Sequence, residues 1–120
     1  MPEAEQPTPP LPIVSRTLDV DGKPCFHLRI FQPYLEDGGN YWRCRYEVDG
    51  PLTRHVGSFC GIDGMQALLL VIYILGTEAD VSEENLTKRL SWNGQSEHFG
   101  FPTHTADPDF VRLPKHDPPD

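Results

Sequence analysis

Residues 61–76 read GIDGMQALLLVIYILG, a sequence that predicts a helix apolar on nearly every side. From Met65 to Leu75 only Gln66 is polar, when Tyr73 is counted as apolar. A membrane-spanning helix takes about 20 apolar residues, and this run is shorter. We therefore expect a helix of a folded core and no membrane span.

The predicted helix has a clear start and a less certain end. Asp63 is placed to cap the free N–H groups of the first turn, and Gln66 three residues later completes a capping box. Gly76 is a candidate stop, although residues 78–85 are also compatible with a longer helix.

Helical periodicity divides this segment into two faces. The face expected to pack on a sheet comprises Met65, Leu68, Leu69, Ile72 and Leu75. The opposite face comprises Gln66, Leu70, Tyr73 and Thr77, with Ala67 and Ile74 at its shoulder. An ordinary surface helix carries charges there, but none precedes Glu78. We therefore predict an interface of Gln66, Leu70, Tyr73, Ile74 and Thr77.

Three covers are compatible with this predicted interface. The chain's own ends can fold across it, although the C-terminal end offers only Phe110, Val111 and Leu113 between prolines. A second copy can pair with it as a homodimer, since two-fold pairing is the commonest way to bury such a face. The third cover is a different protein.

Alternating apolar and polar residues predict strands on both sides of the helix. The expected strands are residues 13–20, 25–32, 41–48 and 52–61, with a last short strand within 86–92. The residues expected to point inward are Phe26, Leu28, Ile30, Trp42, Cys44, Tyr46 and Val48. Short Gly-, Asp- and Asn-containing loops between them favour an antiparallel meander. The predicted fold is α+β, with about four strands, one main apolar helix on the sheet and one short strand after it.

Prolines mark the limits of the predicted domain. Of 13 prolines, five lie in residues 1–12 and five in residues 102–120. Such Pro-rich, acidic ends bury too little apolar surface to offset their ordering entropy. We expect one domain at residues 13–102, a flexible N-terminus before it and a flexible or surface-docked acidic tail at residues 103–120.

Charge and cysteine content narrow the class of protein. The net charge of −8 argues against binding to nucleic acid or to an anionic membrane surface, both of which need basic patches. Three cysteines without CxxC spacing favour free thiols in a reducing compartment, and the first residues lack a secretory signal. We expect a cytoplasmic protein.

The sequence shows no pattern typical of a catalytic or metal centre. No His pair has i, i+4 spacing, and we interpret His98 and His104 as flanking a loop whose Phe99 and Phe101 plug the core. Cys44 and Cys60 fall at strand positions and read as small buried hydrophobes. The Glu83-Glu84 pair reads as a solvated helix end. We expect no enzyme, no cofactor and no metal.

One polar face could hold a ligand. Arg43 and Arg45 lie two apart on a predicted strand and so share a face, where they could bind a carboxylate or phosphate. His27 and His55 are further candidates for this polar ligand face. Arginines in this pattern are more often the solvated side of a sheet.

The order of motifs resembles a family of small bacterial proteins that carry a domain of unknown function. The motifs are a W-x-C-x-Y strand, a G-x-D-x-x-Q-A-L helix, an L-x-W strand and a GFP turn. The matching positions are Trp42, Cys44, Tyr46, Asp63, Gln66, Ala67, Leu68, Trp92, Gly100, Phe101 and Pro102. The resemblance covers residues 41–102 and implies a bacterial origin and a small α+β domain, without an activity or a cofactor.

Two classes of function follow from these observations. The first is a non-catalytic interaction module that masks a basic partner, as immunity proteins and antitoxins do, with acidic charge speeding association. The second is a small-ligand-binding protein or enzyme that uses the outward polar face of the sheet. We favour the interaction module, because the motifs of the second class are missing.

Overall fold

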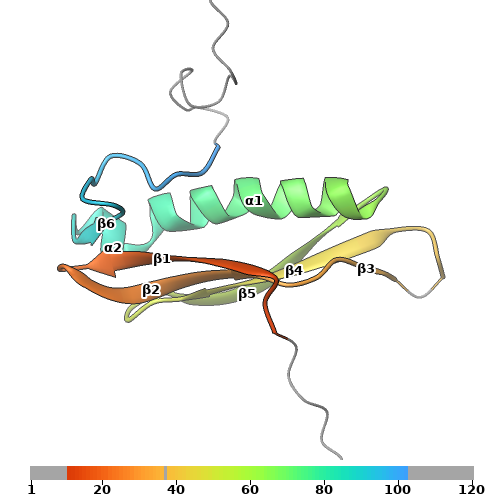
Figure 1. Cartoon of the computed structure of the whole chain (residues 1–120), viewed down its shortest axis with the longest axis horizontal. Helices are drawn as coiled ribbons and strands as arrows, with labels where there is room; N and C mark the ends of the chain where they lie inside the picture. The colour runs from red at the N-terminus through yellow and green to blue at the C-terminus, as the bar shows by residue number, and fades with distance from the viewer. Residues whose placement is uncertain (1–10, 37, 103–120) are drawn as a thin grey trace, which may run out of the picture.

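The computed structural model describes residues 11–36 and 38–102 of the chain. The predictions made for the two Pro-rich ends lie outside these residues, except at Leu11 and Pro12. In the described part, one sheet is covered on one side by a single long helix, α1 (Figure 1).

The helices and strands follow the predicted order. They are β1 (Val14–Val20), β2 (Lys23–Ile30), β3 (Tyr34–Leu35), β4 (Trp42–Asp49), β5 (Arg54–Gly61), α1 (Gly64–Val81), α2 (Glu83–Leu86) and β6 (Leu90–Ser91). The predicted α+β fold, with an antiparallel sheet, one main helix and a short later strand, is confirmed. The short elements β3 and α2 were not predicted, because two to four residues carry too little periodicity to be recognised.

All strand pairs are antiparallel. β5 pairs with the whole of β4, while β2 and β3 pair with the two ends of β4 on its other side. β1 follows β2, and β6 adds a short pairing to the end of β1. The β1–β2 turn uses Asp21 and Gly22 at φ 54° and 82°, the left-handed conformation that two-residue hairpins require.

The core lies between the sheet and α1. Its buried hydrophobic residues are Leu18, Val20, Phe26, Leu28, Ile30, Cys44, Tyr46, Val48, Ala67, Val71, Leu75, Ala79, Leu90 and Phe99. The predicted inward faces of β2 and β4 are therefore confirmed, with Trp42 half-buried against this core. Phe99 and Phe101 close one side of the core, as the sequence predicted.

α1 begins where the capping pattern placed it. The Asp63 carboxylate accepts a hydrogen bond from the Gln66 N–H at 2.8 Å, and the Gln66 side-chain oxygen accepts one from the Ile62 N–H at 2.7 Å. The sequence left two ends open, and of these the longer helix is observed, because α1 continues past Gly76 to Val81. Gly76 instead permits close packing, since a Cβ there would lie 2.7 Å from the Phe101 Cβ.

The predicted sheet-facing stripe of α1 is wrong in part. Met65 and Leu69 point to solvent, with 70% and 51% of their surface exposed. The side against the sheet is instead centred on Ala67, Val71, Leu75 and Ala79, spaced four residues apart. Small residues in this row let α1 approach the strands closely. Because apolar residues surround the helix, periodicity alone could not choose between the two stripes.

A loop after β6 returns across α1 and is clamped by Arg16. Its guanidinium Nη1 donates to the carbonyls of Phe99 and Gly100 at 3.1 and 2.8 Å. The same guanidinium lies 4.6 Å from the ring centre of Trp92 and 4.7 Å from that of Phe101. These contacts give the L-x-W and GFP segments of the sequence one shared structural role, which is to hold residues 92–102 against the core.

Candidate functional site

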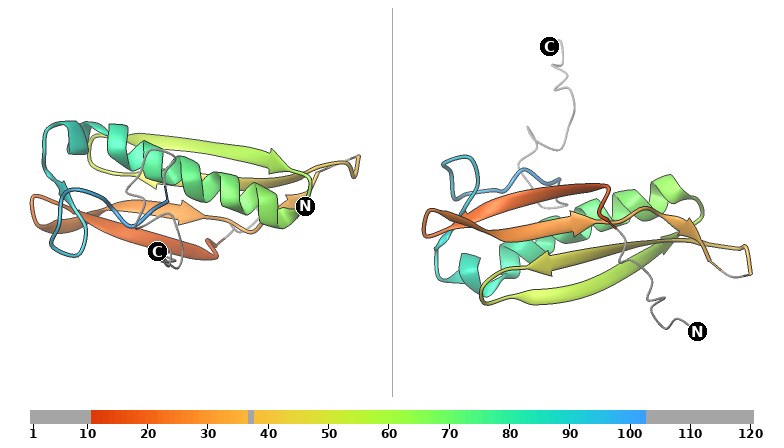
Figure 2. Two further views of the ribbon diagram at one scale, coloured as in Figure 1. Left: turned by 90° about the horizontal axis from the view of Figure 1, so that it is seen from above. Right: turned by 60° about the horizontal axis from the view of Figure 1, so that its bottom comes forward.

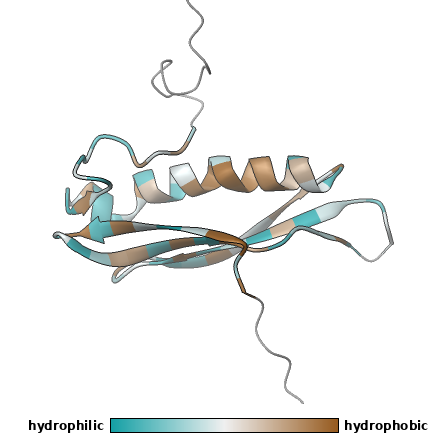
Figure 3. Ribbon diagram, viewed as in Figure 1, coloured by the Kyte–Doolittle hydropathy of each residue, from teal (hydrophilic) through white to brown (hydrophobic). Residues whose placement is uncertain are grey.

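The side of α1 that faces away from the sheet carries a continuous apolar surface, which we call the outer helix face. It comprises Ile62, Met65, Leu69, Leu70 and Tyr73, which are 75%, 70%, 51%, 39% and 39% exposed. Figure 3 shows the hydrophobic colour running along the middle of α1. Most soluble proteins avoid such contiguous apolar surface unless it binds something.

The predicted interface overlaps the outer helix face without coinciding with it. Gln66, Leu70 and Tyr73 are exposed as predicted, whereas Ile74 and Thr77 are half-buried on the flank of α1. Met65 and Leu69, which helical periodicity assigned to the core, are exposed, and so is Ile62, which precedes the helix. The burial of Ala67 fixes the rotation of the helix about its axis and so determines that Met65 and Leu69 point outward.

Charge is segregated between the two layers. No Lys or Arg occurs from residue 55 to residue 87, a stretch that includes all of α1 and α2. Acidic side chains occur at both ends of α1 and beyond it, at Asp63, Glu78, Asp80 and Glu83. The opposite surface of the sheet carries Arg29, Arg43, Arg45 and Arg54. The strand register places these side chains on the same side, because residues paired across strands point to the same face of a sheet. The outer helix face therefore has an acidic surround.

The structure brings three of the four predicted polar ligand residues to the outward sheet surface. Arg43 is bound there to Glu36, with Nε to Oε2 at 2.6 Å, and also donates to the Ser58 hydroxyl at 2.7 Å. Arg45 is exposed, and His27 contacts the Thr17 hydroxyl at 3.1 Å. The hydrogen bond from Arg43 holds the pKa of Glu36 below its ordinary value. Arg43 thus serves an internal ion pair.

His55, the fourth of these residues, lies on the helix side of the sheet. Its Nε2 is 3.2 Å from the Tyr46 hydroxyl and 3.5 Å from a Glu78 carboxylate oxygen. Burial, together with the charge of Glu78, raises the pKa of Tyr46 to about 12, so this hydroxyl keeps its proton at neutral pH. The Tyr46 hydroxyl donates to Glu78 at 3.3 Å and so ties α1 to β4. Gly57 leaves the space that the Tyr46 ring occupies.

Glu84 was predicted to be solvated and is fully buried. Its carboxylate accepts hydrogen bonds from the Leu52 N–H at 2.6 Å, the Thr53 N–H at 3.0 Å and the Thr53 hydroxyl at 2.6 Å. Desolvation raises the pKa of Glu84, but these hydrogen bonds outweigh it and leave the pKa below its ordinary value. The side chain fixes the loop between β4 and β5, and its neighbour Glu83 is exposed as predicted.

The cysteines differ in their surroundings. Cys44 is buried as predicted, and burial raises the pKa of its thiol. Cys60 is only half-buried, because its register opposite Arg43 places it on the outward sheet surface. Among residues 11–36 and 38–102, no group of three or more His, Cys, Asp and Glu side chains could hold a metal ion. His104 lies outside these residues.

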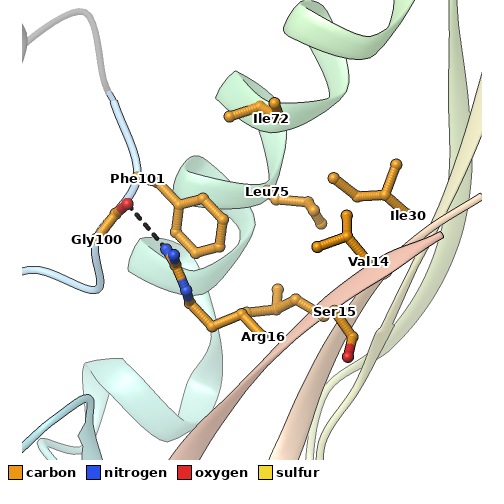
Figure 4. Close-up of a pocket in the computed structure, with 9 residues that line it drawn as sticks. Val14, Ser15, Arg16, Ile30, Ile72, Leu75, Gly100 and Phe101 are labelled. Carbon is orange, nitrogen blue, oxygen red and sulfur yellow. Dashed lines mark hydrogen bonds between the residues drawn. The ribbon is translucent and has the colours of Figure 1, made fainter. Parts of the chain in front are cut away.

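One hollow of about 180 Å³ lies between β1, α1 and the returning loop (Figure 4). Its walls are mainly apolar and include Ile30, Ile72, Leu75 and Phe101. The polar side chains at its edge are Ser15 and Arg16, and the Arg16 guanidinium already binds the Gly100 carbonyl. This hollow offers apolar volume but no converging set of polar side chains of the kind that orients a substrate.

α1 is long and apolar enough to cross a membrane by length and composition alone, a property that core helices of soluble proteins share. In the structure, one side of α1 packs on the sheet through Ala67, Val71 and Ala79, which have no exposed surface. The contact with the sheet, rather than a lipid environment, therefore accounts for the apolar residues on that side. It does not account for the outer helix face.

A comparison with protein families identifies the family to which the chain belongs. Residues 14–103 match the family described as Domain of unknown function (DUF6968), a range that runs from β1 to just past the returning loop. The chain belongs to the DUF6968 family. The outer helix face and the Arg16 clamp both lie within the part of the chain that this family defines. Comparisons with curated proteins and with solved structures gave no match.

Proposed function

We propose that this DUF6968 protein is a non-catalytic protein-interaction module that uses the outer helix face to bind and mask a basic partner. Immunity proteins and antitoxins act in this way. The single observation that carries the proposal is the exposure of Met65, Leu69 and Tyr73 on a helix with no charged residue from Gly64 to Thr77.

The acidic surround supports a basic partner. An interface has an apolar centre and a polar rim, and complementary charge on the rim steers the partner and fixes its orientation. Here Asp63 lies at one end of the outer helix face and Asp80 at the other, without a basic residue between them. A partner with an apolar centre and Lys or Arg around it fits this pattern.

The roles of the polar side chains also favour binding over catalysis. Arg16, Arg43 and Glu84 each hold a loop or neighbouring strand in place, and Tyr46 keeps its proton at neutral pH. Each of these groups therefore has a role in stabilising the fold.

The test begins with capture of binding proteins from a lysate of the source cells on the immobilised full chain. Each captured protein is identified by mass spectrometry and purified, and its affinity is measured by calorimetry against wild type and Met65→Glu. Placing a charge in the apolar centre should weaken binding by more than about tenfold, because a buried apolar side chain of this size contributes about 1.5–3 kcal/mol.

Arg45→Glu is the matched control, since it adds a carboxylate to the opposite surface. This variant should bind as wild type does. Loss of binding with Arg45→Glu but not with Met65→Glu would place the protein contact on the outward sheet surface and contradict the proposal. A captured partner that is acidic at its contact surface would contradict the proposal.

A further inference from the structure

The second unpartnered feature of the described chain is the outer edge of β5. β5 pairs with β4 along its whole length, and no other described strand pairs with it. Figure 2 shows β5 as the outermost strand on one side of the sheet. An eight-residue edge of this kind presents free N–H and C=O groups that can pair with another strand.

The register shows which β5 residues present these groups. The Phe31 N–H donates to the Arg45 carbonyl, so the backbone groups of Arg45 point towards β2. Because these directions alternate along a strand, the backbone groups of Glu47 and Asp49 point the same way. The residues between them face β5, and their β5 partners include His55 and Gly57. The backbone groups of the remaining β5 residues therefore point away from the sheet. They are Arg54, Val56, Ser58 and Cys60.

This edge lacks the usual protections. Natural edge strands are commonly blocked by proline, bulges or several charged side chains. β5 contains no proline, its pairing with β4 has no bulge, and Arg54 is its only Lys or Arg. Val56, in the middle of the strand, is 61% exposed.

The flank of α1 beside this edge is apolar. Gly76 marks the opposite flank, because it packs against Phe101 of the returning loop. Leu70 and Ile74 lie more than a quarter-turn around the helix from Gly76, on the row that continues to Glu78. Glu78 contacts His55 of β5, so this row runs along the β5 side of the molecule.

A second copy brings both a strand to this edge and a helix to packing distance from α1. α1 contacts β4 and β5 to the same extent and so lies above the line between them. With strands about 4.8 Å apart, two paired β5 edges would place the two α1 axes about 10 Å apart. Packed helices have interaxial distances of about 8–10 Å, so the two flanks would meet in contact.

We propose that two copies pair through β5 to form one continuous antiparallel sheet, with the Leu70 and Ile74 flanks of the two α1 helices packed on each other. A two-fold axis at Gly57 sets Arg54 opposite Cys60 and Val56 opposite Ser58, so no like charges oppose each other. Leu70 of the outer helix face is buried in this dimer, whereas Met65 and Leu69 of the same face stay exposed and free to bind a partner.

The test is the mass of the full chain in solution by light scattering and sedimentation equilibrium. The expected species is a dimer of twice the 13.6 kDa chain mass. Leu70→Glu should raise the dimer dissociation constant by more than about tenfold, because it places a carboxylate in the helix contact. Leu69→Glu is the matched control, since the neighbouring leucine points away from the flank and its substitution should leave the dimer intact.

Val56→Pro tests the strand pairing separately. It removes an outward N–H without removing a β4–β5 hydrogen bond, so the fold should persist by circular dichroism while the dimer dissociates. In wild type, the amides of Val56 and Ser58 should exchange with solvent more slowly as protein concentration rises.

Four results would overturn the dimer. They are a monomer at millimolar concentration, a dimer broken by Leu69→Glu but not by Leu70→Glu, a dimer that tolerates Val56→Pro, and a monomer that dimerises only after removal of residues 103–120. The last result would make the chain's own C-terminal segment the cover. Because Met65→Glu lies off this interface, failure of the dimer and failure of the proposed partner binding are distinguishable.

Discussion

Glu84 is a charged side chain without exposed surface, and three hydrogen bonds from Leu52 and Thr53 satisfy its carboxylate. A Cβ at Gly50 would lie 2.7 Å from the same carboxylate, so the loop between β4 and β5 is built closely around it. The sequence offered only a Glu-Glu pair near a helix end. Which of the two is buried depends on a loop some thirty residues earlier in the chain.

We predict that stability depends on the ionisation of Glu84. Its pKa is lowered in the folded state, so its contribution is complete above its ordinary value of 4.5 and is lost as pH falls through the folded value. Glu84→Ala should cost about 2–4 kcal/mol at pH 7, because it leaves three donors without their acceptor. Urea unfolding between pH 7 and pH 3 measures both effects.

Glu83→Gln is the control for this prediction, because Glu83 is the exposed neighbour. It should leave the free energy of unfolding and its pH dependence nearly unchanged, whereas Glu84→Gln should flatten the acid side of the profile. Identical profiles for Glu84→Gln and wild type would show that another carboxylate governs acid stability.

At the scale of elements, residues 92–102 are an irregular segment that behaves as part of the core. The turn at Asn93 and Gly94 has φ of 52° and 82°, and Gly100 has φ of 82°. A Cβ at Gly100 would lie 2.7 Å from the Arg16 guanidinium, so only glycine fits there. The segment therefore depends on a partner at the other end of the chain.

We predict that Arg16→Met releases this segment from α1. The substitution keeps the length of the side chain but removes two charged hydrogen bonds and the contact with both aromatic rings, for a loss of about 2–3 kcal/mol. Hydrogen exchange of residues 95–102 should accelerate more than that of β4. Arg45→Met, on the outward sheet surface, should leave exchange in this segment unchanged. Equal protection in both variants would mean that Phe99 and Phe101 hold the segment without Arg16.

The rotation of α1 shows how an element can be predicted while its contacts are not. The cap at Asp63 and the long apolar run fixed the type and start of the helix. The end was left open by the sequence, because a glycine such as Gly76 can stop a helix or permit close packing within it. The sheet-facing side was misplaced because the row through Ala67 and Val71 is no more apolar than the row through Leu69.

At the scale of the whole molecule, the two layers differ in charge. The segment from residue 55 to residue 87, which includes both helices, contains acidic residues and no Lys or Arg, whereas four arginines lie on the outward sheet surface. On that surface Arg29 pairs with Glu47 and Asp49 at 2.9 and 3.2 Å, which offsets much of its charge. The proposed partner would therefore meet the less compensated side of the molecule.

We predict that binding to the proposed basic partner weakens as salt rises. Charges on the rim of an interface are screened, since the Debye length falls from about 10 Å at 0.1 M to about 3 Å at 1 M salt. The association rate should fall more than the dissociation rate rises, as surface plasmon resonance can measure. Asp80→Asn should reduce the salt dependence, and Glu97→Asn, outside the helix layer, should not. An affinity that is flat with salt would argue against electrostatic masking.

The fold class, the inward faces of β2 and β4 and the helix cap could be predicted without a structure, because each depends on residues close together in the chain. Tertiary structure alone decided the rotation of α1, the burial of Glu84, the clamp at Arg16 and the separation of His55 from Arg43. Each of these depends on contacts between residues distant in sequence, where packing selects among patterns that local periodicity leaves equivalent. The exposed face of α1 was predicted because it lacks charge, and its composition was corrected because small residues determine how closely helix and sheet approach.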